Sequence, residues 1–149
     1  MRTFDPVSVL LCRKGSDIWS LPSDASVYSA IELMADKHVG ALLVIDSGHL
    51  VGIISERDYA RKVILMGRAS KDTFVHEIMT ESPITIRPEC MVDDAMRIMT
   101  DNRIRHLPVV RDETVAGMIS IGDLVNWIIF TQEQTIEQLE HYITGQYPC

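Results

Sequence analysis

The stretch GIISERD at residues 52–58 returns 65 positions later as GMISIGD at residues 117–123. In each copy a short apolar run ends in a serine, and an aspartate follows three residues after that serine. Short β-branched runs bounded by turn residues are typical of buried strands. A serine at the end of such a run is typical of a helix start. Each copy therefore predicts a strand that leads directly into a helix.

The pairs Ser55–Asp58 and Ser120–Asp123 have two interpretations. The first is a helix N-cap with an acidic residue at its third position, as in a capping box. The second is a ligand site, because exposed amides, a hydroxyl and a carboxylate together suit a ribose-phosphate. Gly122 inside the second copy would also let a ligand approach the backbone closely. The two interpretations are compatible, and the sequence leaves both open.

The repeat is much longer than this motif. Without a gap, residues 20–58 align with residues 85–123. The identical pairs include Val27/Val92, Ala30/Ala95, Met34/Met99, Asp36/Asp101, Leu42/Leu107, Val44/Val109 and Gly52/Gly117. Duplication of this length predicts two copies of one structural unit, packed as a pseudo-symmetric pair.

Composition narrows the class of protein. A chain of 149 residues with 46% hydrophobic content is expected to form one globular unit with a sizeable core. A net charge of −7 without a basic stripe argues against a nucleic-acid partner. No apolar run approaches membrane-spanning length and the N-terminus lacks a secretory pattern, so we expect no membrane partner and a cytoplasmic protein. Cys12, Cys90 and Cys149 form no CxxC motif and are expected to be free thiols.

Hydrophobic spacing predicts the order β-α-β-β-α in each unit. In the first copy we expect a short helix over 6–12, a strand over 18–21, a helix capped by Ser26 and stopped by Gly40, strands over 41–45 and 50–54, and a helix over 56–66. In the second copy we expect a helix over 75–79, a strand over 84–86, a helix from 92, strands over 107–110 and 115–119, and a helix from Leu124 to about Thr144 stopped by Gly145. The predicted organisation is a first domain at 7–67, a linker at 68–74, a second domain at 75–130 and a helical tail at 131–149.

These features resemble a pair of CBS (cystathionine β-synthase) domains. The resemblance rests on the paired units, on the helices with Ala30/Met34 and Ala95/Met99, and on the stretches RIRHLPVV and GMISIGDL, and it covers roughly residues 7–129. The stretches GIISERDYARKV and TIEQLEHYITG resemble small stand-alone bacterial CBS-pair proteins and related plant organellar ones. The resemblance implies an α/β fold of two pseudo-two-fold-related CBS domains with an extended C-terminal helix. It also implies a non-catalytic sensor that binds AMP, ATP or NAD(H) between the units, and a disc-like homodimer.

The resemblance also assigns ligand contacts by position. It implies that Asp58 and Asp123 take the ribose hydroxyls and that Ser55 and Ser120 lie on the phosphate side. The complete set of expected ligand-binding residues is Trp19, Gly40, Ala41, Ile54, Ser55, Arg57, Asp58, Thr80, Ile84, Arg105, His106, Pro108, Ile119, Ser120, Gly122 and Asp123.

The two copies differ at one important place. Arg105, His106 and Pro108 match the family's segment beside base and phosphate, whereas the first copy has Gly40 and Ala41 there. We therefore expect the site built on Asp123 to depend more on the ligand's phosphate. Arg57 could supply phosphate charge from the first copy instead.

Other chemistry finds little support in the sequence. HEIMT at 76–80 begins like HExxH but lacks the second histidine, so a zinc hydrolase is not expected, and no convergent acid, base or nucleophile predicts an enzyme. Lys37 and Arg103 end equivalent helices, where favourable charge at a helix C-terminus is the preferred interpretation and phosphate binding is the alternative. The leading hypothesis is a nucleotide-binding regulatory module. The alternative is an interaction protein without a ligand, working through its dimer and its C-terminal helix on an unidentified target.

Overall fold

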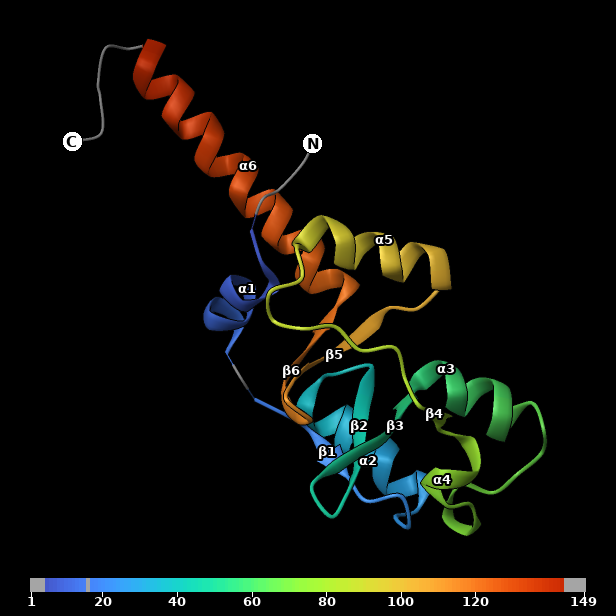
Figure 1. Cartoon of the computed structure of the whole chain (residues 1–149). Helices are drawn as coiled ribbons and strands as arrows, with labels where there is room; N and C mark the ends of the chain where they lie inside the picture. The colour runs from blue at the N-terminus through green and yellow to red at the C-terminus, as the bar shows by residue number, and fades with distance from the viewer. Residues whose placement is uncertain (1–4, 16, 144–149) are drawn as a thin grey trace.

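Two hairpins at the same offset form the centre of the molecule. The computed structural model describes residues 5–15 and 17–143 (Figure 1). The first hairpin joins β2 (Ala41–Asp46) to β3 (His49–Ser55), and the second joins β5 (His106–Arg111) to β6 (Thr114–Ser120). Both hairpins turn through two residues with positive φ, as a type I′ turn requires. Their registers shift at Val44/Ile45 and at Val109/Val110, so even the irregularity is repeated 65 residues later.

Short segments extend each hairpin. β1 (Ser20–Leu21) runs parallel to β2, and β4 (Thr80–Glu81) runs antiparallel to β3, which completes a sheet in the order β1-β2-β3-β4. Beside the second hairpin, the equivalent of β1 is a single parallel bridge from Ile86 to Val109. The predicted strand over 84–86 is therefore wrong in extent, because Ile84 lies at the surface instead of pairing.

Two amphipathic helices, α2 (Val27–Lys37) and α5 (Val92–Asn102), occupy equivalent places in the repeats. Each buries the predicted stripe, which is Val27, Ala30 and Met34 in α2 and Val92, Ala95 and Met99 in α5. The Ser26 side chain accepts a hydrogen bond from the Ser29 amide, so its predicted capping role is confirmed. The predicted stop at Gly40 is wrong, because His38 ends the helix in the left-handed conformation (φ 56°) and its N–H bonds the Met34 carbonyl.

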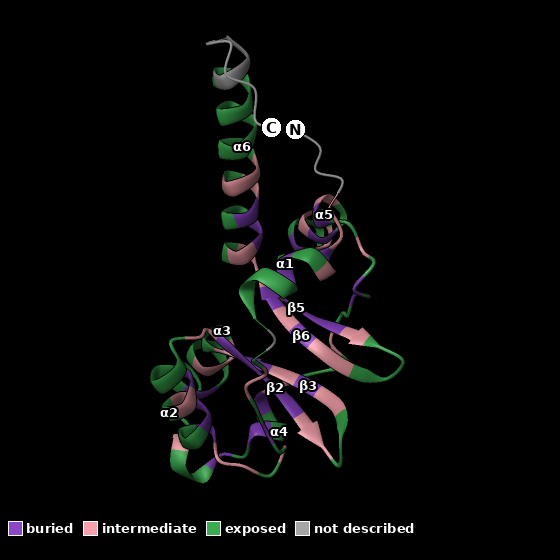
Figure 2. Ribbon diagram, turned by 90° about the vertical axis from the view of Figure 1, so that its left-hand side faces the viewer, coloured by how far each residue is buried: buried purple, intermediate pink, exposed green. Residues whose placement is uncertain are grey.

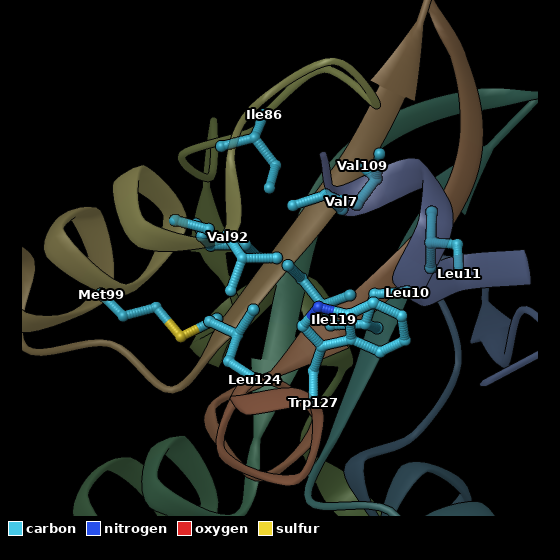
Figure 3. Close-up of a cluster of buried hydrophobic side chains, with 12 residues drawn as sticks. Val7, Leu10, Leu11, Ile86, Val92, Met99, Val109, Ile119, Leu124 and Trp127 are labelled. Carbon is cyan, nitrogen blue, oxygen red and sulfur yellow. The ribbon is translucent and has the colours of Figure 1, made fainter. Parts of the chain in front are cut away.

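The short helix that begins each repeat packs on the other repeat. α1 (Val7–Lys14) contributes Val7, Leu10 and Leu11 to the core that holds α5, β5 and β6 (Figure 3). α4 (Val75–Ile78) contributes Val75 and Ile78 to the core that holds α2, β2 and β3. The duplicated units therefore exchange their leading segments, and neither core is built from one continuous half of the chain.

The helices after the two repeated motifs differ in length. α3 (Glu56–Tyr59) continues as a π-helix over Ala60–Ile64, which agrees with the predicted helix from residue 56. α6 (Ile121–Ile143) begins three residues before the predicted start at Leu124, and Gly145, its predicted stop, lies outside the described residues. Figure 1 shows α6 extending far beyond the rest of the molecule. A 3-10 turn over Ser70–Asp72 lies between the repeats.

Within the part of the chain that the structure describes, the helices fall short of the length and apolar character that crossing a membrane requires.

A cleft between the two repeats as candidate functional site

The two Ser-x-x-Asp motifs form the caps that the sequence predicts. The Ser55 amide donates to Asp58 Oδ2 at 3.0 Å, and the Asp58 amide donates back to Ser55 Oγ at 3.2 Å. The second copy has the same reciprocal pair, at 2.8 and 3.1 Å between Ser120 and Asp123. Such caps fix the carboxylate at the junction of strand and helix. The capping interpretation is thus confirmed for both copies.

A cleft of about 350 Å³ opens beside the Asp58 cap. Its walls come from four parts of the chain: Gly40 before β2, the motif of the first repeat, the segment after α4, and the start of β5 in the second repeat. The lining residues are Gly40, Ile53, Ser55, Glu56, Arg57, Asp58, Thr80, Ser82, Pro83, Ile84, Ile104, Arg105 and His106. A ligand in this cleft would therefore touch both repeats at once.

Eight of the expected ligand-binding residues meet in this cleft, namely Gly40, Ser55, Arg57, Asp58, Thr80, Ile84, Arg105 and His106. The sequence reasoning missed Ile53, Glu56, Ser82, Pro83 and Ile104. Two of these could have been predicted from their place in the sequence, because Ser82 and Pro83 lie between Thr80 and Ile84, which were both expected to bind the ligand. Ile53 could have been found from strand alternation, because it faces the side opposite to its neighbour Ile54.

Several expected residues lie elsewhere. The side chains of Ala41, Ile54 and Ile119 are fully buried in the two cores. The Pro108 carbonyl accepts from the Ile86 amide at 3.0 Å, so this residue holds the short parallel bridge. Trp19 packs against the first core with the Lys37 ammonium 4.5 Å from its ring centroid, which gives Lys37 a contact beyond the helix dipole. Strand pairing and core packing, which the alignment of motifs does not report, account for these positions.

The charged wall of the cleft is built by arginines from both repeats. Arg57 Nη1 donates to the carbonyl of Arg103 at 2.9 Å and so crosses from the first repeat to the second. Next to the cleft, Arg57, Arg103 and Arg105 share a further hollow of about 240 Å³. Guanidinium groups are suited to phosphate because they present several donors in a plane. Arg103, which the sequence assigned to the helix dipole, is thereby placed beside the cleft.

His106 lies at the narrow point between the repeats. The position of a Cβ on Gly40 would be 3.6 Å from His106 Cε1, an ordinary van der Waals contact, so the two segments lie side by side in the cleft wall. Burial lowers the pKa of His106; the Asp123 carboxylate opposes this shift, and Lys14 and Arg105 reinforce it. A neutral imidazole can both donate and accept a hydrogen bond.

The Asp123 side of the molecule is different. Lys14 Nζ lies 2.6 Å from Asp123 Oδ2 and donates to the Met118 carbonyl at 2.7 Å. A hollow of about 280 Å³ between α1 and α6 borders this ion pair, and neither Arg105 nor His106 lines it. Arg105 and His106, which were expected at the Asp123 site, line the Asp58 cleft and not this hollow, although His106 pairs with Ser120 between β5 and β6 and the Asp123 carboxylate acts on its pKa. Ser120 and Gly122 line neither hollow.

Among residues 5–15 and 17–143 no three His, Cys, Asp or Glu side chains are close enough to hold a metal ion together. The side chain at His76 stacks on Phe74, with 5.3 Å between ring centroids.

Comparison with known proteins agrees with this architecture. The family model for the CBS domain matches the chain twice, at residues 12–64 and 75–129. The chain belongs to the CBS domain family. Its two repeats are thus two CBS domains. The cleft lies between the motif of the first domain and two parts of the second, which are residues 80–84 and the start of β5.

Individual CBS proteins resemble it over most of the chain. The mitochondrial CBS domain-containing protein CBSX3 of Arabidopsis thaliana is 47% identical over 138 residues, which cover 89% of this chain and 66% of that protein. A solved protein with CBS domains from Burkholderia ambifaria is 45% identical, with a TM-score of 0.83 over 86% of this chain and 96% of its own. A CBS domain protein from Pyrobaculum aerophilum, solved in complex with AMP, is 27% identical with a TM-score of 0.72, covering 80% of this chain and 89% of its own.

Proposed function

We propose that the cleft beside Asp58 binds an adenine nucleotide and that the CBS pair acts as a regulatory module, not as an enzyme. The observation that carries this proposal is the composition of the cleft walls, in which both repeats surround the carboxylates of Glu56 and Asp58 and two arginines. A ligand that contacts both repeats binds some relative arrangements of the repeats more tightly than others. It can therefore shift the equilibrium between these arrangements. The AMP complex of the Pyrobaculum aerophilum protein supports the same chemical class of ligand.

Each part of a nucleotide has a matching surface. Asp58 lines the cleft, and a carboxylate can accept hydrogen bonds from both hydroxyls of a ribose. Ile53, Ile84 and Ile104 offer apolar surface for a purine ring. Arg57 and Arg105 are placed for the phosphates, with Arg103 in the adjoining hollow. A volume of about 350 Å³ lies in the range of small-molecule sites, roughly 300–1,000 Å³.

The proposal assigns one well-formed site to each chain. On the Asp123 side, the ion pair with Lys14 is shorter, at 2.6 Å, than the ion pair of Asp58 with Lys62, at 3.1 Å, and Trp19 stands where the first cleft has Ile84. We propose that AMP, ATP or NAD(H) binds in the Asp58 cleft. The phosphates of the ligand contact Arg57 and Arg105, and these contacts are the main reason why its affinity exceeds that of adenosine.

A second candidate function is an interaction module, and the exposed apolar side chains favour it. Ile64, Leu65 and Met66 after α3 are 56%, 76% and 70% exposed. The expected homodimer, with contacts through α3 and α6, would cover such surface. The two functions are compatible, because a sensor must pass its state to another chain. We place the protein in the cytoplasm, where thiols such as those of Cys12 and Cys90 stay reduced.

Calorimetric titration with adenosine, AMP, ATP and NADH tests the proposal directly. We expect saturable binding of at least one nucleotide, one molecule per chain, and weaker binding of adenosine. Ligand at a hundred times its dissociation constant should raise the free energy of unfolding by about 2.7 kcal/mol. The absence of heat and of any melting shift with all four compounds at millimolar concentration would contradict the proposal and leave the interaction module in its place.

A further inference from the structure

The second half of α6 leaves the body of the molecule with an unpartnered apolar face. Up to residue 140, Leu124 and Trp127 are the last residues of the helix that are buried, and every residue from 132 to 140 is exposed. Figure 2 shows this part of α6 as a column of mostly exposed residues. A helix of about a dozen residues is marginally stable in water without packing. This segment therefore needs a partner surface to be a stable helix.

The exposed apolar residues follow a heptad spacing. Positions 125, 129, 132, 136 and 139 are separated alternately by four and three residues, and the sequence continues the spacing to Ile143. Four of these positions carry exposed apolar side chains: Val125 at 41%, Ile129 at 49%, Ile136 at 55% and Leu139 at 56%. An alternation of four and three places the residues on one seam of a helix that is paired in a left-handed coiled coil. The remaining seam position is Gln132.

We propose that this seam binds the same seam of a second copy, in parallel and in register. The pattern is self-complementary, because a heptad seam fits an identical seam without any other partner. Gln132 would meet its equivalent across the two-fold axis, and a polar residue at one seam position fixes register in such pairs. The pairing is independent of the proposed nucleotide cleft, because no described residue of α6 lines that cleft.

Charge selects the parallel orientation. Residues 121–143 contain four acidic residues and no Lys or Arg, so a paired helix must keep its carboxylates apart. In a parallel pair, a residue directly before a seam position of one copy faces the residue five positions later in the other copy. Ile128 of one copy then faces Glu133 of the other, and Thr135 faces Glu140. In an antiparallel pair centred on Gln132, Glu133 would instead face Glu133 of the second copy.

Cysteine cross-linking tests both the partner and the orientation. In a Cys12→Ser, Cys149→Ser background, Leu139→Cys should form an interchain disulfide within minutes under mild oxidation, because position 139 meets itself in a parallel, in-register pair and is far from its equivalent in an antiparallel pair centred on Gln132. Gln138→Cys, one residue outside the seam, is the matched control and should cross-link at least tenfold more slowly. Equal rates for the two variants would overturn the proposal. So would a result in which Gln132→Cys cross-links and Leu139→Cys does not, since that indicates an antiparallel pair.

Sedimentation of the full chain supplies the second measurement. The double variant Ile136→Glu, Leu139→Glu should raise the dimer dissociation constant at least a hundredfold, whereas Gln134→Glu, Gln138→Glu adds the same charge outside the seam and should raise it much less. Far-ultraviolet circular dichroism and AMP titration show whether the body of each variant remains folded. A monomeric wild type of 16.8 kDa at micromolar concentration, or equal effects of the two double variants, would overturn the proposal, and a monomer would point to a different protein as the partner of α6.

Discussion

At the scale of single residues, the carboxylate of Asp58 both caps a helix and borders the cleft. Its Oδ2 accepts from the Ser55 amide, and its Oδ1 lies 3.1 Å from Lys62 Nζ, while the whole group borders the cleft. The side chain is 13% exposed, so it is largely fixed before any ligand arrives. A site fixed in this way needs little reordering on binding, which favours affinity.

Asp58→Ala should therefore reduce both stability and affinity. Loss of the cap should lower the free energy of unfolding by about 1 kcal/mol. Loss of hydrogen bonds to a charged group should weaken nucleotide binding by roughly ten- to a hundredfold. The matched control is Asp123→Ala, which removes the equivalent cap and its ion pair with Lys14 but leaves the cleft lining unchanged. Calorimetry and urea unfolding on both variants separate the two roles, and an equal loss of affinity in both would contradict this assignment of the site.

His106 should make the stability of the protein depend on pH. Burial lowers its pKa in the folded protein below the ordinary 6.5, so the unfolded chain binds a proton more readily. The contribution of His106 to the free energy of unfolding is then fully present above about pH 6.5, and it decreases as the pH falls toward the pKa of the folded state. His106→Gln should remove this part of the decrease between pH 7.5 and 5.5, measured by urea unfolding. His49→Gln, at the exposed start of β3, is the control, and a pH profile unchanged by His106→Gln would show that other groups cause it.

At the scale of elements, Gly52 and Gly117 occupy equivalent positions, and a segment from the other repeat packs against the backbone at each of them. A Cβ on Gly52 would lie 2.6 Å from Met79 Sδ and 2.9 Å from the Thr80 carbonyl oxygen. A Cβ on Gly117 would meet only the Leu11 side chain, at 3.0 Å. The backbone of β4 cannot move away as easily as the end of a leucine. The glycine repeated in the sequence thus marks where segments cross between the repeats.

Gly52→Ala should consequently destabilise the protein more than Gly117→Ala. We expect a loss of about 1–3 kcal/mol for Gly52→Ala, the range for an overpacked core, and a smaller loss for Gly117→Ala. Gly40→Ala meets nothing closer than 3.6 Å and should change stability little, although it adds a methyl group to the cleft wall beside His106. Thermal unfolding of the three variants checks this order, and a Gly117→Ala variant less stable than Gly52→Ala would contradict the role given to β4.

At the scale of the whole molecule, the exchange of α1 and α4 makes the two CBS domains depend on each other. Val7 and Leu10 are 0% and 2% exposed in the second core, although they precede the first repeat in the chain. Val75 and Ile78 are equally buried in the first core, although they begin the second repeat. Each of the two cores therefore contains side chains from both halves of the chain.

Cutting the chain between Gly67 and Arg68 should therefore give two fragments that do not fold alone. Fragment 1–67 lacks the Val75 and Ile78 side chains, and fragment 68–149 lacks those of Val7 and Leu10; deleting a single buried side chain of this size already costs about 2–5 kcal/mol. Mixed in equal amounts, the fragments should associate and regain the cooperative unfolding of the intact chain, followed by circular dichroism. If either fragment alone unfolds cooperatively at the temperature of the intact chain, the exchanged helices are not essential to its core.

The sequence alone determined the repeat and most of its elements. Identical residues 65 positions apart, the stripe Val27–Ala30–Met34 and the Ser-x-x-Asp caps are local patterns, and local hydrogen bonding and periodicity are enough to realise them. Element ends were less well predicted, because His38 can adopt the left-handed conformation that was expected of Gly40. The CBS resemblance also named eight residues that meet in one cleft.

Only the tertiary structure decided which pieces face one another. Arg105 and His106 follow the second helix in the sequence, yet they join Asp58 because the two hairpins pack with the start of β5 against the first motif. Lys14 neutralises Asp123 because α1 crosses to the other repeat. Such contacts span more than a hundred residues of chain in the case of Lys14, and they follow from how two amphipathic sheets bury their apolar faces together. No periodicity or motif in the sequence encodes which segments meet, although the sequence already shows that the two copies differ at Gly40 and Ala41 against Arg105 and His106.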